Sequence, residues 1–411
     1  MKKLPNFLCD TWWFALTQRL SDSQFEKIAR LRVKQGFTAV QLVVGIPPEV
    51  GPENPNAASS VGPAWKLNGE LNIKYLEYAK HRIELLNSLG LTVIVYGAWG
   101  HQIEWIRVDK MKAWWRLITK ELDKLNVIYC LTGEADLWVG EENELLPDKS
   151  TDDLHIVRLR QFLHPRIAHL GWRALNLFKL PLIKYKQKER QRKWSEVLKY
   201  LYTLTTKPII IHTTSTTSKE VVNNSQLLSA ITVQTGHSEG SRHSIWKIPY
   251  EMMKKEPTAT FINLEPWYEG IMDRFGVNDQ LYAYWASMMA GAGAYCYGTH
   301  GVWNIGDGKF MAHWGKQTLN EALKLDTPRL LGISHRLFTR KDFKKYKGVK
   351  VIEKNGQLIG ILRSNKKGQS VSYIPDITKY KKLPNGVIFL PLEGSFIKAK
   401  PKTGPVVVIA E

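Results

Sequence analysis

Residues 90–100 read GLTVIVYGAWG, a run of apolar and β-branched residues that ends in glycines and a tryptophan. A run without alternation of polar and apolar residues is typical of a parallel strand that is buried on both faces. Similar runs occur at 37–44 and 126–134. A segment with helical periodicity, 72–89, follows the run at 37–44, and another, 111–125, follows the run at 90–100. The central part of the chain is therefore predicted to alternate strands and helices.

This alternation extends outward in both directions, to about residue 335. Further strand-like runs occupy 7–13, 207–215, 230–237, 258–266 and 293–300. Eight strands, most of them followed by a helix, predict a (β/α)8 barrel. An open doubly wound sheet is the alternative, but polar residues recur at the carboxyl end of nearly every run, as the rim of a barrel active site requires. Ser21 or Ser23 is expected to cap the first helix and Gly36 to end it.

The pattern changes after about residue 335. Short β-branched runs then alternate with Asn-Gly, Lys-Gly and Pro-Asp turn signals up to the end of the chain. We expect residues 340–411 to form a small antiparallel β unit without a catalytic residue. The predicted organisation is a barrel domain at 1–337 and a β domain at 338–411.

The 411 residues include 58 Lys and Arg against 38 Asp and Glu, a formal charge of +20. Such a charge favours anionic partners, but no nucleic-acid motif and no apolar run of about 18 residues accompanies it. We expect a solvated basic surface that includes the run at 179–193, with no nucleic-acid or membrane partner. A basic nucleic-acid-binding protein remains a rival interpretation. Three cysteines without CxxC spacing and no visible leader predict a cytoplasmic protein, and the oligomeric state is left open.

Two carboxylates stand out among the residues that follow the predicted strands. Glu134 and Glu265 each come directly after apolar strand residues, in CLTGE and FINLE. Strands four and seven lie opposite each other in a barrel, so these carboxylates can flank one bond. Glycoside hydrolysis requires such a pair. Either residue alone could instead cap a helix or pair with an arginine, but two on opposing strands favour catalysis.

The other polar and aromatic residues of the strand ends are predicted to bind the sugar. We expect the hydroxyl groups of the sugar to be bound by Asp10, Gln41, His212 and His237. We expect the sugar rings to stack on Trp12, Trp99, Trp267 and Trp303. His212, His237 and His300 would also suit a metal site, but strand one lacks the HxH pattern that would support it. We predict no metal and no cofactor, and the chain has no GxSxG elbow, P-loop or dinucleotide fingerprint.

Several blocks of the chain resemble one known family. They are DTWWFALTQRLS (10–21), YCLTGEADL (129–137), NLEPWYEGI (263–271) and YWASMMAGAGAYCYGTHGVWNIGD (284–307). These blocks are similar to the apiosidase-like glycoside hydrolases, which belong to a large clan of retaining (β/α)8 enzymes, and the likeness covers most of 7–335. The resemblance implies that Glu134 is the acid/base and Glu265 the nucleophile of a retaining hydrolase of oligosaccharides or polysaccharides.

The chain departs from the family pattern at three places. Gly133 stands where the clan usually has an asparagine, Glu134 stands where family members can have an aspartate, and the segment 138–190 is longer than usual. The resemblance therefore does not imply apiose, and it leaves the sugar, the linkage and exo or endo action open. Since no Arg or Lys is among the strand-end residues, we favour a neutral glycan. The alternative from another class is a non-catalytic carbohydrate-binding protein on a degenerate barrel.

Overall fold

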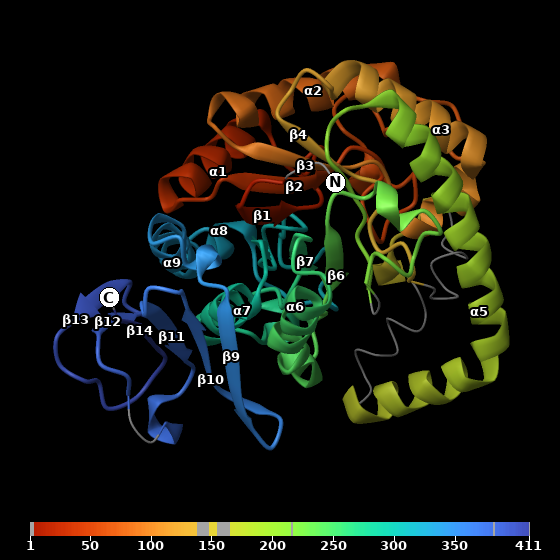
Figure 1. Ribbon diagram of the computed structural model, residues 1–411. Coiled ribbons are helices and arrows are strands. Elements are labelled where there is room, and N and C mark those ends of the chain that lie inside the picture. Colours follow the sequence, from red (N-terminus) through yellow and green to blue (C-terminus); the bar gives the residue numbers. More distant parts are fainter. Residues whose placement is uncertain (1–3, 138–147, 154–164, 215–216, 381–382, 411) are drawn as a thin grey trace.

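The computed structural model describes residues 4–137, 148–153, 165–214, 217–380 and 383–410, with backbone alone for 165–183. The chain forms a nearly closed barrel of eight parallel strands surrounded by helices, and a separate six-stranded antiparallel sheet at the carboxyl end (Figure 1). The predicted fold class is thereby confirmed. The last barrel helix ends at Arg340 and the first strand of the second sheet begins at Gly348, and the domain division at 337/338 stays a prediction.

The barrel strands are short and almost entirely buried. They are β1 (Leu8–Trp12), β2 (Ala39–Val43), β3 (Thr92–Tyr96), β4 (Val127–Cys130), β5 (Ile209–Ile210), β6 (Ile231–Gln234), β7 (Phe261–Glu265) and β8 (Ala294–Tyr297). Their order in the sheet is β5-β4-β3-β2-β1-β8-β7-β6. On the remaining side, the amide of Ser229 donates to the carbonyl of Ile209 at 2.7 Å, which brings the approach to β6 close to β5.

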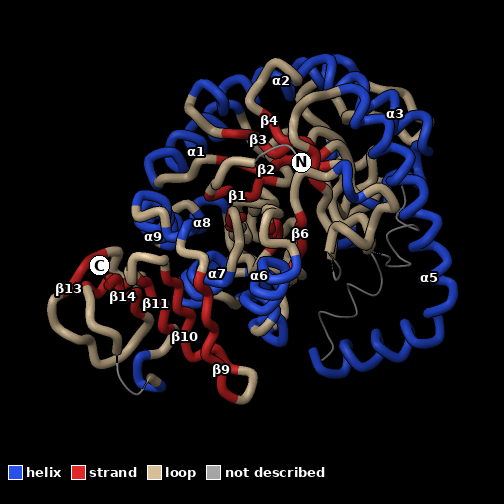
Figure 2. The backbone as a smooth tube through the Cα atoms, viewed as in Figure 1, coloured by secondary structure: helices blue, strands red, loops and turns tan. Residues whose placement is uncertain are grey.

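The helices cover the outside of this barrel, as Figure 2 shows. They are α1 (Asp22–Gln35), α2 (Ile73–Ser88), α3 (Ile103–Leu122), α5 (Pro165–Leu204), α6 (Ser244–Lys255), α7 (Val277–Ala290), α8 (Leu319–Ala322) and α9 (Thr327–Arg340). Ser21 caps α1 in a capping box with Gln24, and Gly36 ends it in a left-handed conformation, as predicted. Among the described residues, no helix combines the length and the apolarity that crossing a membrane requires.

Helix α5 is 40 residues long. Its carboxyl-terminal half packs on the barrel through the buried side chains of Trp194, Leu198 and Leu201. Within the basic run 179–193, the first five side chains lie outside the described part of the chain. Of the following residues most are exposed or half-buried, whereas Arg190 is buried.

The second sheet is antiparallel throughout. Its strands are β9 (Gly348–Lys354), β10 (Gln357–Ser364), β11 (Ser370–Ile374), β12 (Val387–Leu390), β13 (Ser395–Ile397) and β14 (Val406–Ala410), in the order β13-β12-β14-β11-β10-β9. The sheet packs on α7, where Tyr373 stacks on Trp285 with ring centroids 6.1 Å apart. The buried Arg363 donates to the carbonyl of Met289 near the end of α7 at 2.8 Å. The β unit is therefore anchored to the barrel by both apolar and polar contacts.

Candidate active site

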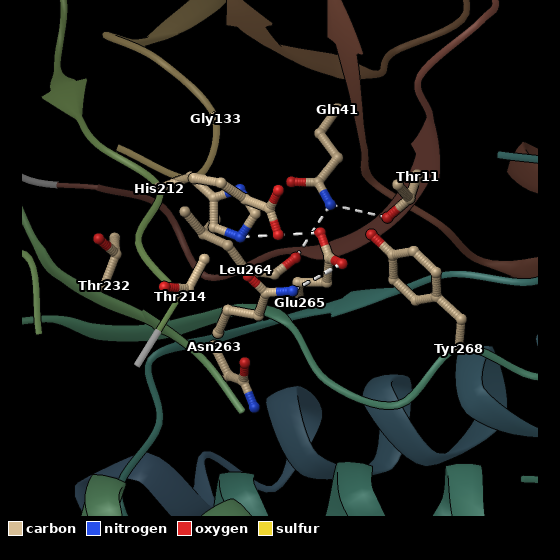
Figure 3. A network of polar contacts seen from close by, with 12 residues as sticks. Thr11, Gln41, Gly133, His212, Thr214, Thr232, Asn263, Leu264, Glu265 and Tyr268 are labelled. Carbon is tan, nitrogen blue, oxygen red and sulfur yellow. Dashed lines mark hydrogen bonds and ion pairs between the residues drawn. The ribbon is translucent and has the colours of Figure 1, made fainter. Parts of the chain in front are cut away.

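Glu265 is the last residue of β7, and its side chain lies within a cluster of polar groups (Figure 3). The residue is only 5% exposed. Gln234 Nε2 and His237 Nε2 each lie 2.9 Å from the Oε1 atom of Glu265. His212 Nε2 lies 3.7 Å from the other oxygen, Oε2. The carboxylate is thus surrounded by nitrogen atoms supplied by the ends of β5 and β6.

The backbone fixes the proton position on His237. The amide of Tyr268 donates to His237 Nδ1 at 3.3 Å, so the ring proton resides on Nε2 and is donated to Glu265. The ring of Tyr268 packs beside His237, with ring centroids 4.6 Å apart. Tyr268 in turn lies over Gly298, where an added Cβ would come within 2.3 Å of the ring. Gly298 therefore provides the space in which this aromatic ring supports the site.

The electrostatic balance keeps Glu265 ionised. Burial raises the pKa of this carboxyl, but the contacts with His237, His212 and Tyr268 more than compensate and hold its pKa below the usual value. Burial lowers the pKa of His212, although the nearby Glu265 opposes this shift. At neutral pH the site therefore holds a carboxylate beside a neutral His212.

Glu134 follows β4 in a different setting. The residue is half-buried, and its backbone adopts a left-handed conformation with φ of 42°. Trp99 Nε1 donates to Glu134 Oε2 at 2.9 Å. A non-glycine residue in this region of backbone space stores strain and is found most often at functional sites. The backbone of Glu134 is thus bent to present a carboxylate that Trp99 orients.

Gly133 explains how Trp99 reaches Glu134. A Cβ at Gly133 would lie 2.3 Å from the six-membered ring of Trp99. The amide of Gly100 also donates to the carbonyl of Gly133 at 2.7 Å, which brings the two strand ends together. The indole therefore fills the space that the side chain of an asparagine would need at this position, and the departure from the clan pattern has a steric reason.

The two carboxylates share neighbouring side chains. The rings of Trp99 and His212 meet edge to face with centroids 5.9 Å apart. Trp13 packs against Trp99 at 5.1 Å and against His212 at 6.4 Å. Since Trp99 binds Glu134 and His212 lies beside Glu265, one aromatic cluster connects both residues. The separation of the two carboxyl groups, expected at about 5–5.5 Å for a retaining enzyme, stays a prediction.

Asp10 and Trp12 lie on the outer side of β1, between this strand and α1. Asp10 forms a fully buried ion pair with Arg32 at 2.6 Å and accepts a hydrogen bond from Trp12 Nε1 at 2.6 Å. The ring of Trp12 packs on Phe25 of α1. These contacts give both residues a structural role in joining a helix to the barrel, in place of the sugar binding expected from the sequence.

Gln41 and Trp267 are also held by protein groups. Gln41 is fully buried, and its amide nitrogen donates to Thr11 Oγ1 at 2.7 Å and to the carbonyl of Leu264 at 3.0 Å. Trp267 is buried and stacks on Phe275 with centroids 4.8 Å apart. Gln41 thus binds the strand that carries Glu265 at the carbonyl of Leu264, and Trp267 supports the loop that follows this strand.

Trp303 and His300 lie on the β8 side of the site. Trp303 is 4% exposed, and its ring lies 6.4 Å from Tyr268 and 5.7 Å from His300. Burial lowers the pKa of His300 to about 4. Within the described ranges, no group of three or more His, Cys, Asp or Glu side chains is arranged to hold a metal ion.

The structure also places at or beside the site four residues to which the sequence interpretation gave no role: Trp13, Gln234, Tyr268 and Trp314. The signal for Trp13 was the register of β1. Thr11 pairs with Gln41, and Trp13 lies two residues after Thr11, so the two side chains share a face. Gln234 ends β6 and, like Trp13, was among the strand-end residues of the sequence, but no role was assigned to it. Tyr268 and Trp314 lie on loops, and no strand pattern locates them.

Comparisons with known proteins agree with this fold. The family model described as "Apiosidase-like, catalytic domain" matches residues 4–345. A solved structure named "Glycoside hydrolase" is 15% identical with a TM-score of 0.70, and the alignment covers 99% of this chain and 92% of that one. A glycoside hydrolase of family 5 from Bacteroides vulgatus is also 15% identical with a TM-score of 0.70, over 98% and 88% of the two chains. No curated protein matched in sequence.

Proposed function

Because the chain belongs to the family of apiosidase-like catalytic domains and is a glycoside hydrolase, we propose that it cleaves its glycan with retention of anomeric configuration. In this proposal Glu265 is the nucleophile and Glu134 the acid/base. The observation that carries the proposal is the environment of Glu265, a 5% exposed carboxylate whose pKa is lowered by its neighbours. A carboxylate that stays ionised at a strand end is the group that attack on an anomeric carbon requires.

The first chemical step uses the two oxygens of Glu265 differently. Oε1 is held by Gln234 and His237, which leaves Oε2, beside His212, to attack the anomeric carbon. The bond between this carbon and the leaving oxygen breaks as the glycosyl-enzyme ester forms. Glu134 donates its proton to the leaving oxygen, so the aglycone departs as a neutral alcohol.

The second step reverses the role of Glu134. Its carboxylate accepts a proton from a water molecule, whose oxygen attacks the anomeric carbon and displaces Glu265. Two inversions at the same carbon give net retention. The half-buried position of Glu134 and the hydrogen bond from Trp99 that orients its carboxylate support this role, because a residue that changes its protonation state twice per turnover needs access to water.

The groups around Glu265 favour a neutral glycan. Its described neighbours are amide, imidazole and phenol side chains, namely Gln234, His237, His212 and Tyr268. These groups exchange hydrogen bonds with hydroxyl groups, whereas a uronate would need a cationic partner such as arginine. Membership of a hydrolase family argues against the non-catalytic sugar-binding alternative.

A substrate screen tests the proposal. We expect hydrolysis of at least one neutral aryl glycoside, and proton NMR of the first product should show the anomer of the substrate. Release of the opposite anomer would contradict the retaining mechanism. Hydrolysis of uronides alone would contradict the neutral substrate.

A further inference from the structure

A second group of polar residues lies beside the catalytic centre, on segments that follow β2, β4 and β8. Both oxygens of Glu49 accept a hydrogen bond from Trp314 Nε1, at 2.7 and 3.0 Å. His313 lies between two carboxylates, with Nε2 3.3 Å from Glu49 and Nδ1 2.8 Å from Asp152. We call Glu49, Asp152, His313 and Trp314 the rim clamp.

Backbone contacts strengthen the rim clamp. The amide of Thr151 donates to the carbonyl of Glu49 at 3.0 Å, and the amide of Met311 donates to Asp152 Oδ2 at 2.6 Å. Glu49 and Met311 both adopt left-handed backbone conformations, with φ of 64° and 56°. Backbone strain of this kind in non-glycine residues persists only where the surrounding structure enforces it, and it is found most often at functional sites. Three segments distant in sequence are therefore held in one fixed arrangement.

The rim clamp reaches the nucleophile through one histidine. The ring of Trp314 lies edge to face with His237, with centroids 6.5 Å apart. His237 donates its Nε2 proton to Glu265, as described above. The carbonyl of Trp314 also accepts from the amide of Met272 at 2.5 Å, which ties the clamp to the loop that follows β7. Trp314 therefore stands between Glu49 and the ring that orients Glu265.

The charge on His313 is part of this arrangement. Burial lowers the pKa of His313, but its hydrogen bonds to Asp152 and Glu49 outweigh burial and raise the pKa to about 9. Among the described residues, His300 interacts electrostatically with His313 and Glu49, and Arg19 does so with Asp152. Because the pKa is raised on folding, the ion pairs stabilise the protein fully below the unfolded value of about 6.5 and lose this effect as the pH rises through about 9.

We propose that Glu49 is a positioning residue, which holds Trp314 against His237 and thereby fixes the carboxylate of Glu265 for attack. The proposal rests on the proposed function, because it gives Glu265 the role of nucleophile. Glu49 acts only through Trp314 and His237. Its loss should therefore lower the rate of the chemical step more than the affinity for substrate.

Two variants separate the hydrogen bond of Glu49 from its charge. Glu49→Ala removes the acceptor of Trp314 Nε1, and we expect kcat to fall about 10-fold while KM changes less than about 3-fold. Glu49→Gln keeps an oxygen for Trp314, so kcat near neutral pH should stay within about 2-fold of the wild type. In Glu49→Gln the imidazole of His313, followed by NMR, should titrate about one pH unit lower, because one carboxylate partner is lost.

Matched controls make the result decisive. Asp307→Asn changes a carboxylate of the loop that follows β8, one that pairs with Arg19, and it should leave kcat unchanged. Trp314→Phe keeps a ring but removes the Nε1 donor, so it should lower kcat as much as Glu49→Ala does. It therefore tests the same hydrogen bond if Glu49→Ala folds poorly. Wild-type kcat in Trp314→Phe or in a folded Glu49→Ala would overturn the proposal.

An activity-independent measurement separates this proposal from the proposed function. The ring resonances of His237 should shift in Glu49→Ala and stay unchanged in Asp307→Asn. If the wild type hydrolyses no glycoside, the proposed function fails, while these shifts still report on the contact from Glu49 to His237. If the wild type is active and the His237 resonances do not shift, the positioning role alone is contradicted.

Discussion

Glu265 ends β7 and Glu134 follows β4 of the same barrel, yet the surroundings of the two carboxylates differ in almost every respect. Glu265 is 5% exposed, and two side chains bind its Oε1 atom at 2.9 Å. Glu134 is half-buried, lies in a left-handed turn, and is oriented by Trp99. The first setting holds a charge in place, whereas the second leaves a carboxyl group accessible to water.

The difference matches what the two chemical roles need. A nucleophile works in one charge state, so donors that lower its pKa are favourable. An acid/base must release and recover a proton in each turnover, and many fixed donors would hinder it. The comparison therefore supports the proposed roles with local structure, in addition to chain order.

The largest effect is expected at Glu265. Glu265→Gln removes the attacking carboxylate, so turnover should fall by at least about 10⁴-fold for every substrate. Steady-state assays on an accepted aryl glycoside measure this loss. The control is Glu256→Gln, the same change at an exposed carboxylate that pairs with Lys219, and it should leave the rate unchanged. A Glu265→Gln protein with more than a few per cent activity would remove this residue from the mechanism.

A smaller effect that depends on the leaving group is expected at Glu134. Glu134→Gln should lower kcat/KM about 10²- to 10³-fold for substrates with poor leaving groups, since general acid catalysis contributes that much. With a dinitrophenyl leaving group, which needs no proton, the first step should be nearly unaffected. Azide should then accelerate the second step and give a glycosyl azide of retained configuration. Azide rescue of Glu265→Gln with an inverted product would mean that the roles are exchanged.

A moderate effect is expected at Gly133. A substitution there tests whether Trp99 positions Glu134. Gly133→Ala would bring a Cβ within 2.3 Å of the Trp99 ring, so the indole must move away from Glu134. We expect a decrease in kcat of about 10-fold and a loss of about 1–3 kcal/mol in the free energy of unfolding. Gly240→Ala is the control, because its Cβ would meet only Ser238 Oγ at 3.4 Å. Wild-type kinetics in Gly133→Ala would show that Trp99 does not position Glu134.

The smallest kinetic effect is expected at Asp10, whose carboxylate lies outside the site. Asp10→Asn leaves the charge of Arg32 buried without its partner, which should cost about 3–5 kcal/mol of stability in chemical denaturation. The folded fraction should keep its KM, because Asp10 faces α1. A raised KM without a loss of stability would restore the sugar-binding role first predicted for Asp10.

The sequence was sufficient for the barrel and the antiparallel β unit, because both depend on local periodicity, whereas the catalytic pairing of Glu134 and Glu265 stays a prediction. It was weaker on which strand-end side chains face inward. In β1 the choice between Thr11 and Trp12 depends on one residue of register, and Trp12 faces α1 instead. Contacts between distant loops were beyond reach. Nothing in the pattern around Glu49 indicates that it binds Trp314, 265 residues further along the chain.

The central claim is that Glu265 is the nucleophile of a retaining hydrolase. The most direct test is to incubate Glu134→Gln with a dinitrophenyl glycoside that the wild type accepts, quench the reaction, and map the modified peptide by mass spectrometry. Since the second step is slow in this variant, the glycosyl-enzyme should accumulate. The account predicts one added glycosyl group, attached to Glu265. A glycosyl group on any other residue, or turnover without a covalent intermediate and with an inverted product, would contradict it.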